Sequence, residues 1–441
     1  MFCKAKPQEN PENSGEHPQK NKMKQKEVID MANIKPFRAV RPKAAYAADV
    51  AALPYDVYNR TEAKKEVEQH PMSFLKIDRP ETQFPEHQDM YAPEVYEQAA
   101  KTMWGMLDEG IFCEEQKECF YLYELGSEGH SQTGIVACAS IDDYLNQVIK
   151  RHENTKPEKE EDRIRHVQAC QAQTGPIFLA YRSQPELRRL IEIKKRNHPV
   201  YSFFSDDGIS HKVWVIEDRL TIDKISALFQ KMDSIYIADG HHRAASAIKA
   251  GLKKRKEHPD YQGTEEFNYF LCTLFSCDEL KILDYNRVVK DLNGYTEAEF
   301  LQKINTCFSV EDKGTEQVRP DKKGVFGMYL GETWYRLEIK PEYISKDAVE
   351  GLDVSILQNY LLNPVLGIQN PGADPRIDFI GGIRGLSELE RRVQEDCQVA
   401  FSLYPTSMEE LMKTADEGRL MPPKSTWFEP KLRSGLFIHR I

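Results

Sequence analysis

The feature that most constrains the fold is a strand-to-helix transition at residues 234–251, SIYIADGHHRAASAIKAG. Its first half is rich in β-branched residues, which favour a strand. The strand breaks at an Asp-Gly pair, and an alanine-rich sequence that favours a helix follows at once. A chain that passes so sharply from strand to helix is expected to combine a sheet with packed helices.

The polar residues at this transition are candidates for chemistry. Asp239 and Gly240 form the turn, and His241, His242 and Arg243 occupy the first helical turn. Free N–H groups at a helix N-terminus favour anions, and glycine lets a phosphate approach the backbone. Arg243 can pair with phosphate oxygens, and Asp239 can hold a magnesium ion. The alternative is a helix-capping Asp239 with surface histidines, which three polar or charged residues directly after a buried strand disfavour.

A second candidate is IKRHENT at 149–155, which places Glu153 beside His152. A carboxylate flanked by histidine and arginine can act as a general base. Taken alone, the segment is more typical of a solvated helix end. A metal-hydrolase site on the adjacent pair His241–His242 is weaker still, because neighbours on a helix do not face one ligand.

The third candidate is MPPKSTWFEPKLRSGL at 421–436. Two prolines, Lys424, Ser425 and Lys431 give a stiff loop that carries basic and hydroxyl groups. A tail that packs on the body through its aromatic residues explains the same segment equally well.

Local patterns predict further elements. Apolar spacing predicts a helix over 91–110, and MSFLKIDRPE at 72–81 is expected to form a short strand. The buried strands CFYLYEL and GIVACASID are expected to pair across the turn SEGHSQT. Strands and helices continue to alternate along the chain, which indicates a mixed α/β (α+β) architecture.

The length of 441 residues predicts two or three domains. Residues 1–30 are nearly all polar and are predicted to be disordered. Residues 31–290 are expected to form the core, with an N-terminal elaboration. Residues 291–441, where the composition becomes more helical around one hairpin, are expected to form a C-terminal α/β domain.

Composition disfavours several classes of protein. The net charge of −10 argues against a general nucleic-acid coat or a binder of anionic membranes. No apolar stretch approaches the roughly 18 residues of a membrane span. The nine cysteines include no CxxC pair, which supports neither a disulfide scaffold nor a zinc ribbon. We therefore expect a cytoplasmic protein with neither nucleic acid nor membrane as a partner. The sequence leaves the oligomeric state open, with a homodimer as one alternative.

Several of these segments together resemble a bacterial family catalogued as a domain of unknown function. They are IKPFRAVRP, the HE pair, IADGHHR and MPPKSTWFEPKL, and the resemblance runs from Met31 to Ile441. A more distant resemblance links the HE pair and DGHHR to free-serine kinases of the ParB/sulfiredoxin-like superfamily. It implies a ParB-like catalytic core with additional elements, whose two motifs are separated here by insertions.

The resemblance also implies roles for residues. Glu153, with His152 beside it, matches the catalytic base, and Asp239 matches the metal-linked carboxylate. The Gly-His-His-Arg sequence at 240–243 matches the phosphate-binding part. In LDYNRVV the family usually has a histidine where Asn286 stands, so Arg287 is the better candidate for contact with substrate or phosphate.

The expected activity is the transfer of a phosphoryl group from ATP or ADP, with Mg²⁺, to the hydroxyl of free L-serine, which gives O-phosphoserine. Pyrophosphate as donor and threonine or homoserine as acceptor remain open. Two alternatives belong to other classes. One is a ParB-like regulator that binds a nucleotide and makes no product, and the other is a structural or interaction protein that keeps the fold without activity.

Overall fold

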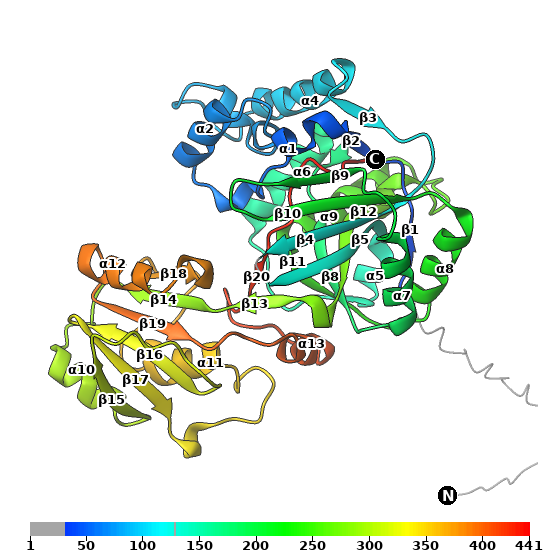
Figure 1. Cartoon of the computed structure of the whole chain (residues 1–441). Helices are drawn as coiled ribbons and strands as arrows, with labels where there is room; N and C mark the ends of the chain where they lie inside the picture. The colour runs from blue at the N-terminus through cyan, green and yellow to red at the C-terminus, as the bar shows by residue number, and fades with distance from the viewer. Residues whose placement is uncertain (1–30, 128) are drawn as a thin grey trace, which may run out of the picture.

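The computed structural model describes residues 31–127 and 129–441. The expected disordered extension, residues 1–30, lies outside the described residues. The chain builds two mixed α/β parts, each around its own large sheet (Figure 1). The predicted mixed α/β class is therefore confirmed.

The first part contains a nine-stranded mixed sheet. Its order is β6-β11-β8-β12-β5-β4-β10-β9, with β1 added on β5. The pairs β11–β6 and β12–β8 are parallel, and the remaining pairs are antiparallel. The strands are β1 (Ile34–Lys35), β4 (Phe120–Ser127), β5 (His130–Ser140), β6 (Ile149–Lys150), β8 (Ile177–Tyr181), β9 (Tyr201–Phe204), β10 (Ser210–Ile216), β11 (Ile235–Asp239) and β12 (Tyr269–Ser276).

Helices cover one face of this sheet. Apolar residues of α5, α7, α8 and α9 join the strands in one buried cluster, to which α9 contributes Ala244 and Ile248. The helices of this part are α5 (Ile141–Leu145), α6 (Pro157–Cys170), α7 (Pro185–Lys194), α8 (Arg219–Phe229) and α9 (His241–Glu257). The sequence therefore predicted the unit β11–α9 correctly, and the expected pair of strands is the antiparallel hairpin β4–β5.

A helical elaboration precedes β4. It contains α1 (Ala47–Val50), α2 (Arg60–Gln69), α3 (Leu75–Asp78), α4 (Pro93–Asp108) and the pair β2 (Val40–Pro42) with β3 (Phe112–Glu114). The prediction of a helix over 91–110 is confirmed by α4. The prediction of a strand at 72–81 is wrong, because this segment forms α3, whose Leu75 and Ile77 are buried in one cluster with Met103 of α4.

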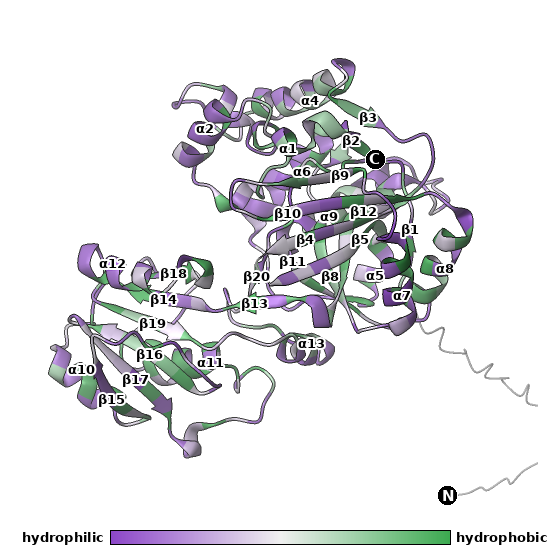
Figure 2. Cartoon of the chain, viewed as in Figure 1, coloured by the Kyte–Doolittle hydropathy of each residue, from purple (hydrophilic) through white to green (hydrophobic). Residues whose placement is uncertain are grey.

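The second part contains a six-stranded antiparallel sheet with the order β15-β17-β16-β19-β14-β18. Its strands are β14 (Tyr285–Val289), β15 (Phe308–Gly314), β16 (Val325–Leu330), β17 (Thr333–Ile339), β18 (Ile377–Gly381) and β19 (Val399–Leu403). Its helices are α10 (Glu297–Ile304), α11 (Asp353–Leu357), α12 (Ser387–Glu395) and α13 (Met408–Asp416). In Figure 2, hydrophobic residues predominate along β16 and hydrophilic residues on α2.

The C-terminal segment connects the two parts. After α13 it forms β20 (Trp427–Glu429), which pairs with β13 (Lys281–Leu283). It then runs into the first part and ends in β21 (His439–Arg440), which pairs with β7 (Ala172–Gln173; Figure 1). One apolar cluster accordingly contains residues of both sheets. The expected division into domains at residues 290 and 291 stays a prediction.

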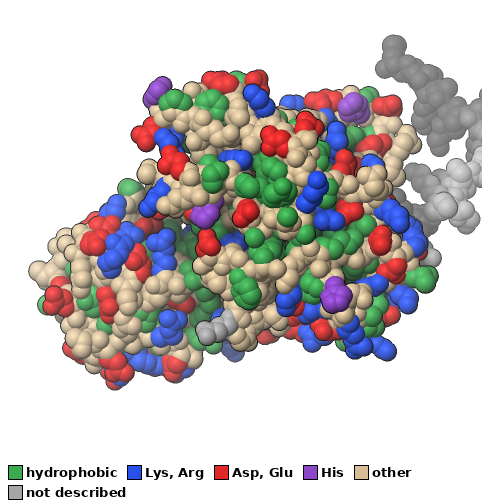
Figure 3. All heavy atoms as spheres, turned by 45° about the horizontal axis from the view of Figure 1, so that its top comes forward, with side chains coloured by type: hydrophobic (Ala, Val, Ile, Leu, Met, Phe, Trp, Pro, Cys, Tyr) green, Lys and Arg blue, Asp and Glu red, His purple; other side chains and the backbone are tan. Residues whose placement is uncertain are grey.

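Surface charge is mixed on the face drawn in Figure 3, where basic and acidic side chains alternate over both parts. No helix among the described residues is long and apolar enough to cross a membrane.

Candidate active site at the ends of β6 and β11

The start of α9 is built by a glycine in the left-handed conformation. Gly240 has φ +91°, and a Cβ atom at this position would lie 3.1 Å from Nε of Arg243. Glycine adopts this conformation without a steric penalty. No side chain caps α9, so that the backbone N–H groups of its first turn have no partner within the helix. The predicted anion-binding geometry, a bare helix N-terminus after a buried strand, is present.

Asp239 does not act as a helix cap, the alternative to a chemical role. Its Oδ1 accepts a hydrogen bond from the N–H of Gly240 at 2.7 Å, and its Oδ2 accepts one from Nζ of Lys431 at 2.8 Å. Burial would raise the pKa of Asp239, but Lys431 and Arg243 outweigh this effect and hold the pKa well below its usual range. The carboxylate is therefore ionised and neutralised by a lysine.

This arrangement is unfavourable for a magnesium ion on Asp239. Each carboxylate oxygen accepts a hydrogen bond from a protein donor, and one of the donors is an ammonium group that repels a divalent cation. The expectation that Asp239 holds the metal is not supported by its observed contacts.

His152 and Glu153 come directly after β6, whose Ile149 and Lys150 pair in parallel with β11. Because parallel strands end at the same sheet edge, these two residues lie beside the start of α9. The ring of His152 packs edge-on against the ring of His241, with 4.5 Å between ring centroids. The alternative of a solvated helix end is wrong, since only 2% of His152 is exposed.

Glu153 and His241 face each other, with Oε2 3.9 Å from Nδ1. Burial raises the pKa of Glu153 more than nearby Lys424 lowers it. Burial also lowers the pKa of His152 to about 4 and that of His241 well below its usual value. Both imidazoles are therefore neutral at pH 7, and Glu153 is a stronger base than an exposed carboxylate.

The other two residues of the helical turn point elsewhere. Nε2 of His242 accepts a hydrogen bond from the N–H of Lys156 at 3.0 Å. Nη1 of Arg243 donates to the carbonyl of Pro176 at 2.7 Å, and its side chain also lies against Gly175. A role of these two side chains in phosphate binding stays a prediction.

The C-terminal segment lies over the ends of both strands. The N–H of Met421 donates to the carbonyl of His152 at 2.8 Å, and Oγ1 of Thr426 lies 3.5 Å from Nε2 of His152. Nζ of Lys431 lies 4.7 Å from the ring centroid of Trp427. The segment therefore packs on the protein through its aromatic residues, as one interpretation of its sequence predicted. It also brings positively charged side chains to the site, as the other interpretation predicted.

Lys424 has a left-handed backbone, with φ +62°, and its Nζ lies 5.7 Å from the ring centroid of Tyr285. Burial would lower the pKa of Lys424, but Tyr285 and Glu153 raise it overall, so its charge is retained. Ser425 is buried, and its hydroxyl donates to the carbonyl of Pro422 at 2.6 Å. The structure therefore places Lys424 near the base and gives Ser425 a structural contact.

Arg287 is buried in β14 and contacts the backbone of this loop. Its Nη2 donates to the carbonyl of Lys424 at 2.9 Å, and its Nη1 donates to the carbonyl of Tyr285. Burial lowers the pKa of Arg287 to about 10. Asn286, at the position where the family pattern usually has histidine, donates to Asp284 and accepts from the N–H of Leu403. Both side chains contact the protein itself, so a contact of Arg287 with a ligand stays a prediction.

The sequence analysis names Lys431 as a basic residue of the third candidate segment but does not predict its pairing with Asp239. The two residues are 192 positions apart in the chain. A single lysine in a proline-rich loop does not indicate such a pairing in the sequence. The pairing forms because the C-terminal segment runs back to the nine-stranded part.

A cleft of about 230 Å³ lies between the N-terminal elaboration and α6. Its walls include Tyr55, Tyr58, Tyr91 and Tyr96. Asp56 and Lys159 also line it, and the charges of both act on His242 at the start of α9.

Comparisons with known proteins place the chain in a family. Its fold resembles, distantly, a free serine kinase in complex with AMP (TM-score 0.33, 15% identity, covering 68% of this chain and 91% of that chain). It also resembles SbnI with C-terminal truncation from Staphylococcus aureus (0.36, 12%, 68% and 85%) and a conserved hypothetical protein from Pyrococcus furiosus (0.34, 14%, 68% and 94%). No curated protein matches. Residues 34–355 match the family described as protein of unknown function (DUF1015), and the chain belongs to that family.

Proposed function

We propose that this protein is a small-molecule kinase that phosphorylates the hydroxyl of free L-serine. The observation that carries the proposal is the position of Glu153, a half-buried carboxylate with a raised pKa, beside the uncapped N-terminus of α9. A base and an anion site at one sheet edge are what transfer of a phosphoryl group to an alcohol requires. The resemblance of the HE pair and DGHHR to free-serine kinases supports the same assignment.

The proposed chemistry uses Glu153 as the base. It accepts the proton of the serine hydroxyl while the serine oxygen bonds to the transferring phosphorus and the bond from phosphorus to the nucleotide breaks. The products are O-phosphoserine and a nucleotide that is shorter by one phosphate. The raised pKa of Glu153 brings its basicity closer to neutral pH, which favours proton transfer.

Positive charge for the transferring group comes from several sources in this proposal. The backbone N–H groups after Gly240 provide the end of a helix dipole. Lys424 and Lys431 add two ammonium groups, and Arg243 adds a guanidinium whose Nη1 is fixed on the carbonyl of Pro176. Phosphoryl transfer depends mainly on such charge neutralisation and positioning.

Asp239 then has a role different from the predicted metal ligand. Its contact with Lys431 holds the ammonium group at the end of β11, so it acts as a positioning residue. ATP or ADP is the proposed donor, and the tyrosine-lined cleft is the proposed place for the nucleoside, because the charges of its residues Asp56 and Lys159 act on His242. The proposal includes a cytoplasmic protein without a nucleic-acid partner, and the net charge of −10 supports the absence of nucleic acid.

The test is incubation with a panel of amino acids and with ATP, ADP or pyrophosphate, followed by mass spectrometry of phosphorylated amino acids. O-phosphoserine is expected with the native chain and not with Glu153→Gln. Nucleotide binding without any phosphorylated amino acid would instead favour the ParB-like regulator. Absence of both would contradict the proposal and the alternative.

A further inference from the structure

Two histidines and one glutamate gather where β6 and β11 end. In His152, Glu153 and His241, one ligand atom from each side chain lies within 4.8 Å of the other two. The two imidazoles are almost fully buried, at 2% and 7% exposure. The three residues come from two segments that only the parallel pairing of β6 with β11 brings together.

Two ring nitrogens in this group are poorly satisfied. Nε2 of His241 is buried and forms no hydrogen bond within the described chain, and Nδ1 of His152 forms none of normal geometry, although the backbone of Ile237 raises the pKa of that imidazole. Nε2 of His152 lies 3.5 Å from Oγ1 of Thr426. A buried polar atom without a partner is costly, and such atoms point to a bound group that the protein chain does not itself contain.

The two imidazole nitrogens and the carboxylate oxygen indicate which kind of metal ion the site would bind. Imidazole nitrogen suits zinc and other late divalent transition metals, whereas magnesium prefers oxygen ligands. Ligands of one tetrahedral zinc ion lie about 3.3 Å apart, given bonds of 2.0–2.1 Å. The 3.9 Å between Oε2 of Glu153 and Nδ1 of His241, the nitrogen that faces the glutamate, is close to this spacing. All three ligand atoms lie within 4.8 Å of one another, so the side chains need only a small closure to share one ion.

We propose that His152, Glu153 and His241 form a binding site for a divalent transition-metal ion of the zinc class. Three protein ligands leave the fourth position open, as in zinc sites that bind water or a substrate. The adjacent residue His242 takes no part, because its Nε2 is bound to the N–H of Lys156.

The site gives a form of regulation that rests on the proposed function. A divalent ion bound to Glu153 stabilises the ionised carboxylate, so that the glutamate accepts the serine proton much less readily. Binding of the metal therefore switches the kinase off, and its removal restores the base.

The test measures metal binding directly, without substrate. The full chain is stripped with a chelator and titrated with Co²⁺, followed by visible absorption, and with Zn²⁺, followed by calorimetry. One ion per chain is expected. His241→Ala and Glu153→Gln are expected to weaken binding at least tenfold, whereas His242→Ala, on the same helical turn, is the matched control and keeps wild-type affinity.

Each outcome decides the matter. Absence of saturable binding, equal affinity in the wild type and Glu153→Gln, or an equal loss in His242→Ala would overturn the site. Melting curves check each variant, and if His241→Ala unfolds, Glu153→Gln carries the test because it keeps size and shape. A chain that binds the metal but phosphorylates no amino acid when metal-free would contradict the proposed function and leave the metal site standing.

Discussion

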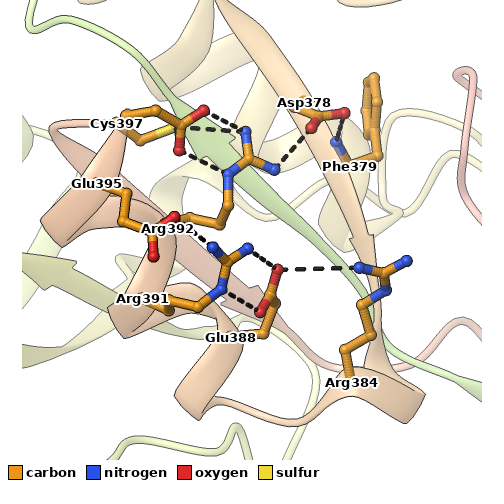
Figure 4. A network of polar contacts seen from close by, with 9 residues as sticks. Asp378, Phe379, Arg384, Glu388, Arg391, Arg392, Glu395 and Cys397 are labelled. Carbon is orange, nitrogen blue, oxygen red and sulfur yellow. Dashed lines mark hydrogen bonds and ion pairs between the residues drawn. The ribbon is translucent and has the colours of Figure 1, made fainter.

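Two clusters of charged side chains, one on each part, are built in different ways. On the six-stranded part, Arg391 pairs with Glu388 and Glu395 of the same helix, in the network with Arg392 shown in Figure 4. These residues lie three or four positions apart, and Arg391 is half exposed. On the nine-stranded part, the pair Asp239–Lys431 joins distant segments. Exposed local ion pairs add little stability, whereas a buried pair carries a cost of desolvation. The difference shows that this molecule buries charge at the edge of the nine-stranded sheet.

The distribution of histidine follows the same division. All twelve histidines lie outside residues 259–438, so that the six-stranded sheet contains none. A carboxyl group that burial perturbs strongly there is Asp353 of α11, whose pKa rises to about 7. The nine-stranded part instead holds neutral buried imidazoles such as His152. The contributions of His152 and Asp353 to the free energy of unfolding should therefore depend on pH with opposite signs.

The largest effect is expected for Glu153→Gln. This change keeps the size of the side chain but removes the proton acceptor, so turnover in the serine assay should fall about 10²- to 10⁴-fold. Nucleotide affinity should change by less than about tenfold. Glu388→Gln, in the network of the other sheet, is the control and should leave both unchanged. Wild-type turnover in Glu153→Gln would place the base elsewhere.

The second effect concerns acid. The folded pKa of His152, about 4, lies below its ordinary value of 6.5, so the unfolded state binds the proton first as pH falls. The free energy of unfolding should therefore fall between pH 6.5 and 4, with about 3 kcal/mol due to His152. His152→Gln should make this dependence shallower in denaturant titrations. An unchanged slope would show that the imidazole is not held neutral.

Asp353 should behave in the opposite way. Its folded pKa of about 7 lies above the ordinary 3.8, so it costs stability as pH rises from 3.8 to 7. The carboxylate contacts only the N–H of Gly324 within hydrogen-bond distance. Asp353→Asn should thus stabilise the protein at pH 8 by about 2 kcal/mol and make little difference at pH 4. Equal effects at the two pH values would contradict the raised pKa.

Lys431→Met tests the long-range pair. It leaves Asp239 without its cation in a site that is two-thirds buried, and should lower the free energy of unfolding by about 2 kcal/mol. Nucleotide affinity should fall as well if the ammonium binds phosphate. Arg391→Met on the exposed network is the matched control, with an unchanged unfolding midpoint. A similar loss of unfolding free energy in both variants would show that the buried long-range pair and the exposed local pairs contribute equally to stability.

The smallest effect separates backbone strain from contact. Gly240 and Gly385 both have positive φ, at +91° and +73°, so alanine should cost about 1 kcal/mol at either position. Only at Gly240 would the new Cβ press on Arg243, since nothing lies within 4 Å at Gly385. Gly240→Ala should therefore also weaken nucleotide binding severalfold, measured by calorimetry. Equal binding by both variants would show that Gly240 serves the turn alone.

Local sequence was sufficient for the elements that depend on neighbouring residues. The transition from β11 to α9, the hairpin β4–β5 and the helix α4 follow from patterns within about twenty residues. The strand predicted at 72–81 failed because packing on α4 overrode local preference at Leu75 and Ile77. Local pattern also nominated Glu153 and Asp239, but could not show whether either is buried.

The sequence by itself determined that a strand ends at Asp239 and Gly240 and that a helix begins at once, because side-chain sterics and backbone freedom act between neighbours. Only the tertiary structure decided what meets there. Parallel pairing of β6 with β11 buried His152 against His241, and the return of the C-terminal segment gave Asp239 a lysine. Burial and pairing depend on contacts between residues far apart in the chain, and these set the ionisation on which the chemistry of the site depends.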